Sequence, residues 1–452
     1  MSEIRYCLGH SCAFRCFSAI KMFVFFVLVF RFLSLFDLLI YINIGILYIY
    51  MWNLYGKQYD LSSFIELHPG GPEILLKTKG EKDITVLFET YHAFSNIDKI
   101  KQTLQKYLII HDREATETYD FTNYHKLSEK VKKTFANREA IKSTPFRDCT
   151  SLLMTGLYAI SFYNMLYSPI LMIQSLFAIM AGVAYMSLGF IVMHDASHYG
   201  YSKDPDTNLW LSKIWNGWGL WNSDIWFYHH VYNHHSFTGV ENADPDLYHL
   251  RPFARKRKTD QRIPSYFLSI QDKLAPIVLF CIPGEYVGQC ISYLMASFKH
   301  KVFRIPLPRK GCHDTIDVLL MSCKLYGLYH MPYSVIACYL VSLNIAYSIN
   351  IIPDHDTFES SVENHYSGPD WCKMQICNSG NFLNDNFIWT HLFGSINYQI
   401  EHHLFPNMSG VHYPTIAPIV REFCKENNIK YVHHDTLWSA YKSFIKTMIY
   451  AR

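Results

Sequence analysis

The sequence has 452 residues, and 41 Lys and Arg against 38 Asp and Glu give it a formal charge of only +3. This balance argues against nucleic-acid binding, which is associated with a strong basic excess. Charged residues make up 17% of the chain, where about 25% is usual for soluble domains, and 50% of the residues are hydrophobic. The composition excludes a disordered chain and favours membrane-embedded segments.

Cysteine and histidine usage narrows the chemistry further. The 12 cysteines contain no Cys-x-x-Cys pair, so neither a structural zinc site nor a disulfide framework is predicted. The 23 histidines are the unusual number in this composition. Their placement along the chain decides the functional interpretation.

The first 51 residues form an N-terminal segment whose apolar part is interrupted only by Lys21, Arg31 and Asp37. The apolar stretch is too long for a cleaved signal peptide, and no small-residue cleavage site follows it. A single span here would place the next domain on the opposite side of the membrane from the histidine clusters described below. A signal anchor, a re-entrant or interfacial segment and an incorrect start of translation are therefore all left open.

Residues 52–111 predict a small soluble domain, and a charged linker follows at 112–148. In this domain His68 begins the sequence His-Pro-Gly-Gly, and His92 follows 24 residues later (92 − 68 = 24). Two histidines on separate helices can hold a haem from opposite faces, and the glycines let the backbone approach the porphyrin edge. Such bis-histidine ligation leaves no open iron position, so the haem would carry electrons. Spacing alone leaves two unrelated surface histidines beside a turn as an equal alternative.

Three apolar regions after residue 148 predict membrane-spanning helices, since a span needs about 20 apolar residues. The uncharged run 149–193 predicts two helices joined by a tight turn; the region 275–298 is interrupted by Pro283 and Glu285, and the region 318–352 contains one charge, Lys324. Histidine clusters flank the last two regions, so they share one side of the membrane only if an even number of spans separates them. We therefore predict about four spans, including one within 275–298 and one within 325–352.

The orientation follows from basic residues. The run Arg255-Lys256-Arg257-Lys258, together with Arg262, lies in the loop on the side of the clusters and favours a cytosolic location by the positive-inside rule. A nuclear signal is a poor alternative for a chain with spans on both sides of this run. The loop at 299–310 is also basic and weakens this orientation unless it lies in the cytosolic interface. Residues 426–452 are predicted as a cytosolic tail.

Three histidine clusters lie outside the predicted spans. They are His194 and His198; His230, His234 and His235; and His402 and His403, the last preceded by Gln399. Spacings of three and four place side chains on one helix face, so each cluster is predicted to present two or three imidazoles in one direction. Neutral imidazole suits iron, zinc and copper, and seven histidines are too many for one ion. The clusters predict a two-metal site.

Carboxylates are predicted only in a supporting role. Iron sites in helical bundles use paired Glu-x-x-His motifs, but this chain has a single one, from Glu89 to His92, and that histidine already belongs to the predicted haem site. An all-histidine site is therefore preferred. Candidates for acceptors that fix the imidazole tautomers are Asp195, Glu401, Asp244 and Asp246.

A histidine pair can also have a simpler explanation, a solvent-exposed helix face. A single His-x-x-x-His on an exposed helix is more often a solvated face than a metal site, but three clusters that bracket membrane spans are hard to explain in this way. His355, just past the last predicted span, is the best placed further ligand. His229 and His391 are weaker candidates.

The first domain resembles a known family. Trp52, Gly56, Tyr59-Asp60, Phe64 and His68-Pro69-Gly70-Gly71 resemble the cytochrome b5 family over about 52–111. The resemblance implies an α+β domain with haem b, held by His68 and His92 as axial ligands. One departure is that the apolar N-terminal stretch stands where this family has a polar first strand and helix.

The three clusters resemble the histidine boxes of membrane fatty acid desaturases, here over 149–425. The fused haem domain and Gln399 at the start of the third box resemble the front-end desaturases, which insert a double bond between an existing one and the carboxyl end of an acyl chain. HVYNHHSFTGVENADPDL at 230–247 and QIEHHLFP at 399–406 carry this likeness. Within this delta-5/delta-6-like group, the His-x-x-x-His-His form is closest to delta-5-like enzymes.

The resemblance implies a complete electron-transfer and oxidation system. Two non-haem irons would be ligated by His194, His198, His230, His234, His235, His402 and His403, with Gln399 at the site and His355 as a further ligand. O2 would be the co-substrate, NADH would supply electrons through a separate NADH-cytochrome b5 reductase, and the substrate would be an acyl-CoA or a phospholipid acyl chain. The chain would be a multi-pass protein of the endoplasmic reticulum membrane with its active site and haem domain in the cytosol.

Three rivals share parts of this pattern. A sphingolipid long-chain-base desaturase has the same domain plan, including the glutamine in the third box. A lipid hydroxylase uses the same kind of site and differs in transferring a hydroxyl group in place of the second hydrogen abstraction. A membrane-anchored haem electron carrier with an inactive second site would be no enzyme, although the completeness of all three boxes argues against it.

Overall fold

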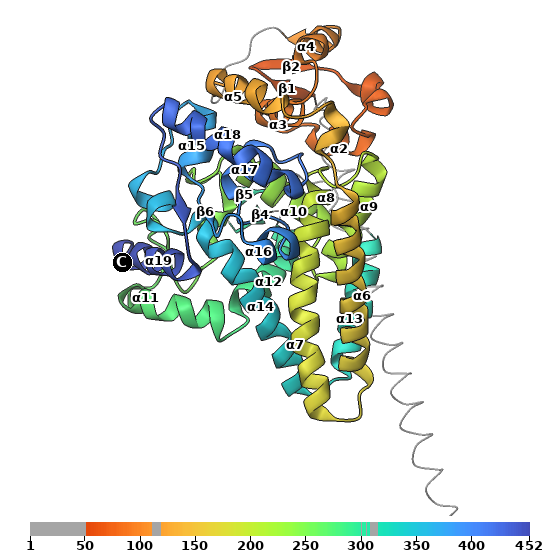
Figure 1. The fold of residues 1–452 in the computed structure, drawn as a ribbon, viewed down its shortest axis with the longest axis vertical. Helices are drawn as coiled ribbons and strands as arrows, with labels where there is room; N and C mark the ends of the chain where they lie inside the picture. Colours follow the sequence, from red (N-terminus) through yellow and green to blue (C-terminus); the bar gives the residue numbers. More distant parts are fainter. Residues whose placement is uncertain (1–50, 111–118, 300, 304, 308–314) are drawn as a thin grey trace, which may run out of the picture.

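The computed structural model describes residues 51–110, 119–299, 301–303, 305–307 and 315–452. Figure 1 shows a small unit of strands and short helices seated on one end of a long, mostly helical body. Of the N-terminal segment predicted over 1–51, all but Met51 lies outside the described residues.

The N-terminal unit, which we call the haem domain, is α+β as predicted. Its antiparallel sheet has the order β1 (Trp52–Leu54), β2 (Lys57–Tyr59), β3 (Leu108–Ile110), and its helices are η1 (Ser62–Leu67), α2 (Pro72–Thr78), α3 (Thr85–Tyr91) and α4 (Ile97–Gln105). Tyr55 and Gly56 join β1 to β2 with positive φ angles of 51° and 67°, as a two-residue hairpin turn requires. Trp52 is fully buried and donates its indole N–H to the Leu75 carbonyl at 2.9 Å, so it fastens the sheet to α2.

The body consists of long helices with short elements packed between them. The long helices are α6 (Pro145–Tyr167), α7 (Leu171–Leu188), α9 (Pro205–Trp218), α11 (Ser265–Phe280), α12 (Gly284–Lys299), α13 (Thr315–Tyr329), α14 (Tyr333–His355), α18 (Tyr413–Glu426) and α19 (Leu437–Tyr450). The short helices are α8 (Asp195–Ser197), α10 (Ser223–Trp226), α15 (Trp371–Cys377), α16 (Phe387–Leu392) and α17 (Gln399–Leu404), with 3-10 turns at η5 (Pro245–Tyr248) and η7 (Gly410–His412). The strand pairs are β4 (Lys301–Val302) with β5 (Ile305–Pro306), antiparallel, and β6 (Asn381–Phe382) with β7 (His433–His434), parallel.

Two long helices carry histidines to the same level of the body. The uncharged run forms two helices joined by a short turn, α6 and α7, as predicted. Helix α7 continues through the π-helix η3 (Gly189–His194) into α8, and α14 packs along α7 and ends at His355. In Figure 1 these helices extend downward, away from the haem domain. The end of α7 and the end of α14 that carry histidines therefore lie on one side of any membrane that the helices cross.

The number of spans differs from the prediction. By length and composition, two helices in the described part of the chain could cross a membrane, Leu171–Ser197 and Tyr333–Glu363, and a third is added only if Ser265–Phe280 and Gly284–Ala296, bent by 82°, form one broken span. Four spans are thus not confirmed. The described part of helix α13 has 15 residues, so at 1.5 Å per residue it extends about 22 Å, against a hydrocarbon core of about 30 Å.

Exposed apolar side chains cover the lower part of the body. Leu152, Leu153 and Met172 on α6 and α7 are 73%, 74% and 78% exposed. Soluble proteins rarely expose such contiguous apolar surface, which is the kind of surface that lipid covers. Exposed tyrosines at the ends of these helices and of their neighbours, such as Tyr167 and Tyr333, are typical of the membrane–water interface.

The segment 112–148, predicted as a charged linker, contains α5 (Thr122–Lys132) and η2 (Arg138–Ile141) where the structure describes it. Tyr124, Leu127 and Val131 lie on one face of α5 and are buried against the body, because spacings of three and four align them. The Tyr124 hydroxyl donates to the Leu404 carbonyl at 3.0 Å, directly after the third histidine box. The amphipathic helix α5 was not predicted, because this segment is rich in charged residues.

The C-terminal residues 426–452, predicted as a tail, also pack against the body. Helix α19 lies against α11 and α14, and its Phe444 and Met448 are fully buried. The Gln271 side chain on α11 donates to the Met448 carbonyl at 2.6 Å. This helix is therefore a structural part of the body.

Candidate metal centre and haem pocket

The haem domain holds His68 and His92 across a cavity of about 320 Å³. His68 ends η1 and His92 ends α3, and the centroids of their rings are 6.3 Å apart with the ring planes at 79°. Two iron–nitrogen bonds of about 2 Å, plus the distance from each nitrogen to its ring centre, give roughly 6 Å between two axial imidazoles. The spacing fits one haem iron between the two rings.

Hydrogen bonds orient both rings for ligation. His68 Nδ1 lies 3.0 Å from the Gly71 carbonyl and His92 Nδ1 lies 2.7 Å from the Phe88 carbonyl, so each Nδ1–H donates and each Nε2 keeps its lone pair. Burial lowers the pKa of His68, and it lowers the pKa of His92 to about 4. Both imidazoles are therefore neutral near pH 7, which is the form that binds iron. A Cβ at Gly70 would come within 2.7 Å of the His68 ring, so only glycine fits beside this ring.

Part of the pocket wall comes from outside the haem domain. Tyr199, Ser202, Lys203 and Asn407 of the body line the same cavity, as does Arg138. At the seam, a Cβ on Gly71 would lie 3.0 Å from the Pro205 Cβ, so the glycine turn after His68 packs directly on the start of α9. The haem domain is thus docked, with its pocket facing the body.

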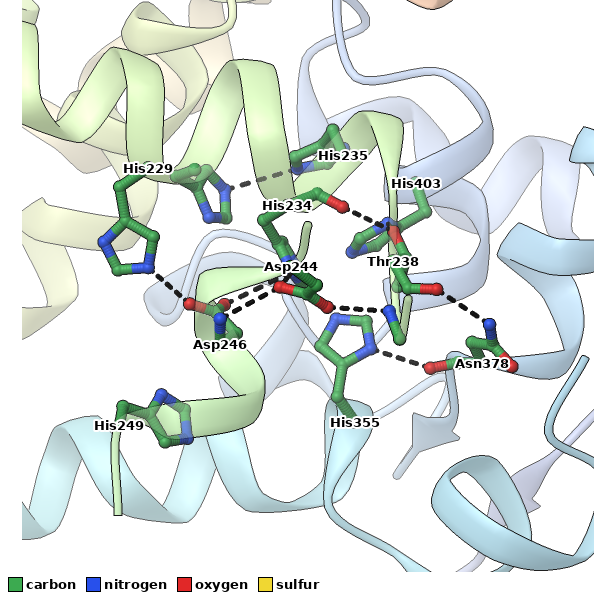
Figure 2. A network of polar contacts seen from close by, with 12 residues as sticks. His229, His234, His235, Thr238, Asp244, Asp246, His249, His355, Asn378 and His403 are labelled. Carbon is green, nitrogen blue, oxygen red and sulfur yellow. Dashed lines mark hydrogen bonds and ion pairs between the residues drawn. The ribbon is translucent and has the colours of Figure 1, made fainter. Parts of the chain in front are cut away.

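The seven box histidines and His355 converge in two groups below the haem domain. The first group is His194, His198, His230, His235 and His402, and the second is His234, His355 and His403; within each group the ligand nitrogens lie within 4.8 Å of one another. Figure 2 shows His234, His355 and His403 turned toward one another. His194 ends η3, His198 directly follows α8, and His355 ends α14. The others lie on the π-helix η4 (Phe227–His234), directly after it at His235, and on α17.

The nitrogen atoms have the spacing of ligands that share an ion. His230 Nε2 lies 3.0 Å from His194 Nε2 and 3.3 Å from His235 Nε2. Metal–nitrogen bonds of about 2.1 Å at roughly right angles separate two such nitrogens by about 3 Å. Among the described residues, the buried Nε2 atoms of His402 and His403 have no hydrogen-bond partner. Unpartnered imidazole nitrogens in a buried, converging set fit a metal ion.

A π-helix decides which histidines of the second box act together. On an α-helix, the spacing of four would pair His230 with His234, and His235 would point elsewhere. The chain here is wound as the π-helix η4, whose hydrogen bonds join residues five apart, and His230 and His235 contribute to the first group while His234 contributes to the second. The ligand atoms of His230, His234 and Asp246 also lie within 4.8 Å of one another, at the boundary between the two groups. Two imidazoles of this box, those of His230 and His235, thus contribute to one group, and the third contributes to the other. The adjacent His402 and His403 are likewise divided between the two groups.

Most of these histidines donate Nδ1–H to a partner from a distant segment. The partners are Tyr91 Oη for His198 (3.1 Å), Asp244 Oδ1 for His234 (3.0 Å), the Asn378 carbonyl for His355 (2.9 Å), Tyr413 Oη for His402 (3.0 Å), and Gln375 Oε1 for His403 (2.8 Å). With the proton on Nδ1, each Nε2 keeps a lone pair that can bind metal. Of these partners only Asp244 was predicted from the sequence, because no spacing within the boxes indicates the other four.

Two of the four predicted acceptors contact histidines and two do not. Asp244 accepts from His234, and Asp246 accepts from His229 at 2.5 Å and lies 3.4 Å from His234, as Figure 2 shows. Asp195 instead accepts from the Ser409 hydroxyl at 2.9 Å and from the Gly410 amide. Glu401 accepts from Asn381 and Tyr431 at 2.7 and 3.0 Å. These last two carboxylates fix the segments around the boxes instead of the imidazoles.

The remaining candidates separate clearly. His229 uses both ring nitrogens, with Asp246 and with Tyr293 Oη at 2.7 Å, so it is a supporting residue. His391 packs against Phe146 and lies in neither group. Gln399 lies at the centre, with its Nε2 2.9 Å from His355 Nε2.

Electrostatics favour neutral ligands. Burial lowers the pKa well below the usual range for His198, His230, His235, His402 and His403. His234 differs: although burial lowers its pKa, the Asp246 and Asp244 carboxylates outweigh burial and raise it. A more basic imidazole is a stronger ligand for a metal cation.

A narrow apolar pocket of about 40 Å³ opens beside the centre. Met186 and Met193 line it from α7 and η3, and Tyr347 and Ile351 line it from α14. His194, His230, His234 and His355 form its inner wall. The pocket therefore connects the apolar part of the body with both histidine groups, and sequence analysis had identified none of its apolar lining.

Together, the fold and the two sites define a helical, membrane-compatible oxidoreductase with a buried histidine cluster that could hold metal and a docked domain of the haem-binding type. Comparison with family models agrees: residues 170–435 match the fatty acid desaturase family, and residues 51–111 match the cytochrome b5-like heme/steroid binding domain. The chain belongs to the fatty acid desaturase family. It is an acyl-lipid desaturase of the front-end type with its cytochrome b5 domain fused upstream.

Individual proteins similar to this chain are also named as desaturases. The chain is 28% identical to an acyl-lipid (8-3)-desaturase of Mortierella alpina, over 86% of this chain and 91% of the relative. It is 27% identical to an acyl-lipid (8-3)-desaturase of Physcomitrium patens, over 86% and 85%. It is 26% identical to delta(5) fatty acid desaturase A of Dictyostelium discoideum, over 83% and 85%.

Proposed function

We propose that the chain inserts a delta-5-like cis double bond into polyunsaturated acyl chains, with iron at both histidine groups and haem b between His68 and His92. The observation that carries the proposal is the convergence of eight histidines in two groups directly below the docked haem pocket. The delta-5 position is supported by the (8-3) and delta(5) names of the relatives.

In this proposal two iron ions and O2, when bound, supply an oxidant strong enough to remove hydrogen from unactivated CH2 groups. Neutral imidazoles of the first group, and His234, His355 and His403 of the second, hold the ions. The Nδ1 acceptors fix the ring orientations before the ions bind, so little reorganisation is needed. The apolar pocket beside Met193 and Ile351 holds the acyl chain against the histidines and excludes water.

The electron supply and the location are part of the same proposal. Electrons come from NADH through a separate NADH-cytochrome b5 reductase to the haem, and the substrate is an acyl-CoA or a phospholipid acyl chain. The haem domain and both histidine groups lie at one end of the spanning helices α7 and α14, which supports placing them on one side of the membrane. We assign that side to the cytosol, at the endoplasmic reticulum.

The basic run that suggested this orientation is largely engaged within the body. Lys256 is buried in an ion pair with Asp356, and Arg257 contacts His365 at 2.9 Å. These contacts make the run weaker support for orientation than its composition indicated. Protease protection of a tag at the C-terminus, in sealed microsomes, tests the cytosolic assignment directly: a protected tag would contradict it.

The test of activity is fatty-acid profiling, by gas chromatography–mass spectrometry, of yeast that express the chain and are fed polyunsaturated acids. We expect a new acid with a double bond on the carboxyl side of an existing one. His234→Ala should abolish this product while the haem spectrum of the purified protein is kept. A hydroxylated acid, or new unsaturation in sphingoid bases only, would contradict the proposal and select one of the rivals.

A further inference from the structure

Tyr91 lies between the haem pocket and the histidine centre and is connected to both. Tyr91 ends α3 and directly precedes His92 in the chain, and its hydroxyl lies 3.1 Å from His198 Nδ1. His92 belongs to the haem pocket, and His198 belongs to the first histidine group. The connection from the haem ligand His92 to the histidine His198 therefore consists of one peptide link, the Tyr91 side chain and one hydrogen bond.

The state of His198 fixes the direction of that bond. In the described part of the chain, the buried Nε2 of His198 has no hydrogen-bond partner and lies in the first histidine group. When Nε2 carries the lone pair for the metal, Nδ1 carries the proton and donates it to Tyr91 Oη. Tyr91 thereby selects the tautomer of His198 that can bind metal.

The position of Tyr91 is itself fixed from the side of the body. Asn407 donates its Nδ2–H to the Tyr91 carbonyl at 3.0 Å, and Asn407 follows the third histidine box by four residues. The haem domain is further anchored by the ion pair of Lys77 with Asp224 at 2.8 Å. The docking that these bonds secure keeps the Tyr91 hydroxyl at His198.

Two other hydrogen bonds across the same seam, in the part of the chain that the structure describes, end on the backbone of the haem domain. The Tyr228 hydroxyl donates to the Lys77 carbonyl at 2.8 Å, and the Tyr232 hydroxyl donates to the Asp83 carbonyl at 3.0 Å. Both bonds secure docking in the same way as the Tyr91 bond, but they offer no path between the two sites.

We propose that Tyr91 is the positioning residue for electron transfer: it couples the haem to the iron centre through the path His92–Tyr91–His198. This inference rests on the proposed haem and di-iron function. In each transfer, one electron is lost by ferrous haem, which becomes ferric, and is gained by one ferric ion of the centre, which becomes ferrous. No bond is broken, and Tyr91 keeps its proton throughout.

The test compares Tyr91→Phe with Tyr228→Phe in the full-length protein, purified in detergent. Both variants lose one hydroxyl and one bond across the seam, but only the first loses the bond to His198. After anaerobic reduction of the haem by one electron, its re-oxidation by the ferric centre is followed by stopped-flow absorbance. The amplitude reports the fraction of molecules that contain iron, and the rate constant does not depend on that fraction.

We expect Tyr91→Phe to slow haem re-oxidation about 10- to 100-fold, in the range found when a partner of a metal ligand is removed. Tyr228→Phe should keep the rate of the unmodified protein, and both variants should keep its haem spectrum and haem midpoint potential. An unchanged rate in Tyr91→Phe, or equal slowing in both variants, would overturn the inference. If the unmodified, iron-loaded protein shows no re-oxidation at all, the proposed function fails and not merely the role of Tyr91.

Discussion

The haem pocket and the histidine centre use the same chemical device but build it differently. In both, a neutral imidazole donates Nδ1–H to a fixed acceptor and keeps Nε2 for iron. In the haem domain the acceptors are backbone carbonyls three or four residues away, Gly71 for His68 and Phe88 for His92. In the centre, His403 depends on Gln375, which is 28 residues away, and His198 depends on Tyr91, which is 107 residues away.

The haem ligands are thus oriented by local structure, whereas the ligands of the histidine centre are oriented by tertiary packing. A backbone carbonyl within the same turn is present as soon as the turn forms, so the haem ligands are oriented by their own segment. The acceptors of the centre are in place only after α3, α15 and the body have packed together. We therefore expect side-chain substitutions of acceptors to affect the iron centre strongly and the haem pocket hardly at all.

The largest effect should come from removing one ligand in each of the two regions. His68→Ala should remove the b-type haem spectrum and leave iron binding intact, whereas His403→Ala should weaken iron binding and keep the haem. Each should lower desaturation by at least about 100-fold, because ligand loss should cost more than the loss of a partner. Haem absorbance, iron content and product yield would be measured on the same preparations. Loss of both cofactors in either variant would show that the two sites do not assemble independently.

A smaller effect is expected for an acceptor. Gln375 Oε1 accepts from His403 Nδ1 at 2.8 Å and from the Thr238 hydroxyl at 2.8 Å, so Gln375→Leu removes the partner of a ligand at similar volume. Iron affinity should fall about 10- to 100-fold while the haem spectrum stays unchanged. Iron titration of the metal-free protein measures this.

The matched control for that variant is Gln271→Leu. Gln271 is also fully buried, but its amide donates to the Met448 carbonyl, far along the chain from any box. The Gln271→Leu variant should have a free energy of unfolding lower by about 1–3 kcal/mol and an unchanged iron affinity. Equal losses of iron affinity in both variants would mean that Gln375 acts through general stability.

The carboxylates allow a finer comparison. The carboxylates of Asp246 and Asp244 both raise the pKa of His234, with the charge of Asp246 acting the more strongly. Asp244→Asn keeps an oxygen for His234 Nδ1 but removes one of these two negative charges, so iron affinity should fall about tenfold. Glu401→Gln should change it little, because burial raises the pKa of Glu401 to about 7 and its partners are Asn381 and Tyr431. Iron titration should separate the two variants; a larger loss in Glu401→Gln would contradict the assignment of Asp244.

The contrast between local and tertiary contacts also explains which parts of the two sites could be predicted from the sequence. His68 and His92 were predictable because their spacing and glycine turn are local, and all box histidines converge as expected. The division of His230 and His235 from His234 depends on π-helical winding, which does not follow from a spacing of four. Tyr91 and Gln375 contact ligands only through tertiary packing. Helix α5 was missed because its charged residues outnumber the few aligned apolar ones.

The smallest effect concerns the seam where the two regions meet. Burial raises the pKa of Glu81 to about 7, against a usual 4.5, and outweighs the lowering effects of Tyr232 and Lys82. Below pH 4.5 the carboxyl is protonated in both the folded and the unfolded state. Between pH 4.5 and 7 the folded state binds the extra proton, so the free energy of unfolding falls as pH rises, and it levels off above pH 7.

Glu81→Gln should therefore flatten the pH dependence of thermal stability between pH 5 and 7.5. At pH 8 the variant should be more stable than the unmodified protein by about 1–3 kcal/mol, allowing for partial solvent screening of the carboxyl. The midpoint of haem release on heating, measured across this range, reports the effect. Glu66→Gln, at an exposed carboxyl of the same domain, should leave the profile unchanged. A parallel profile in both variants would mean that Glu81 ionises as freely in the docked domain as in the unfolded chain.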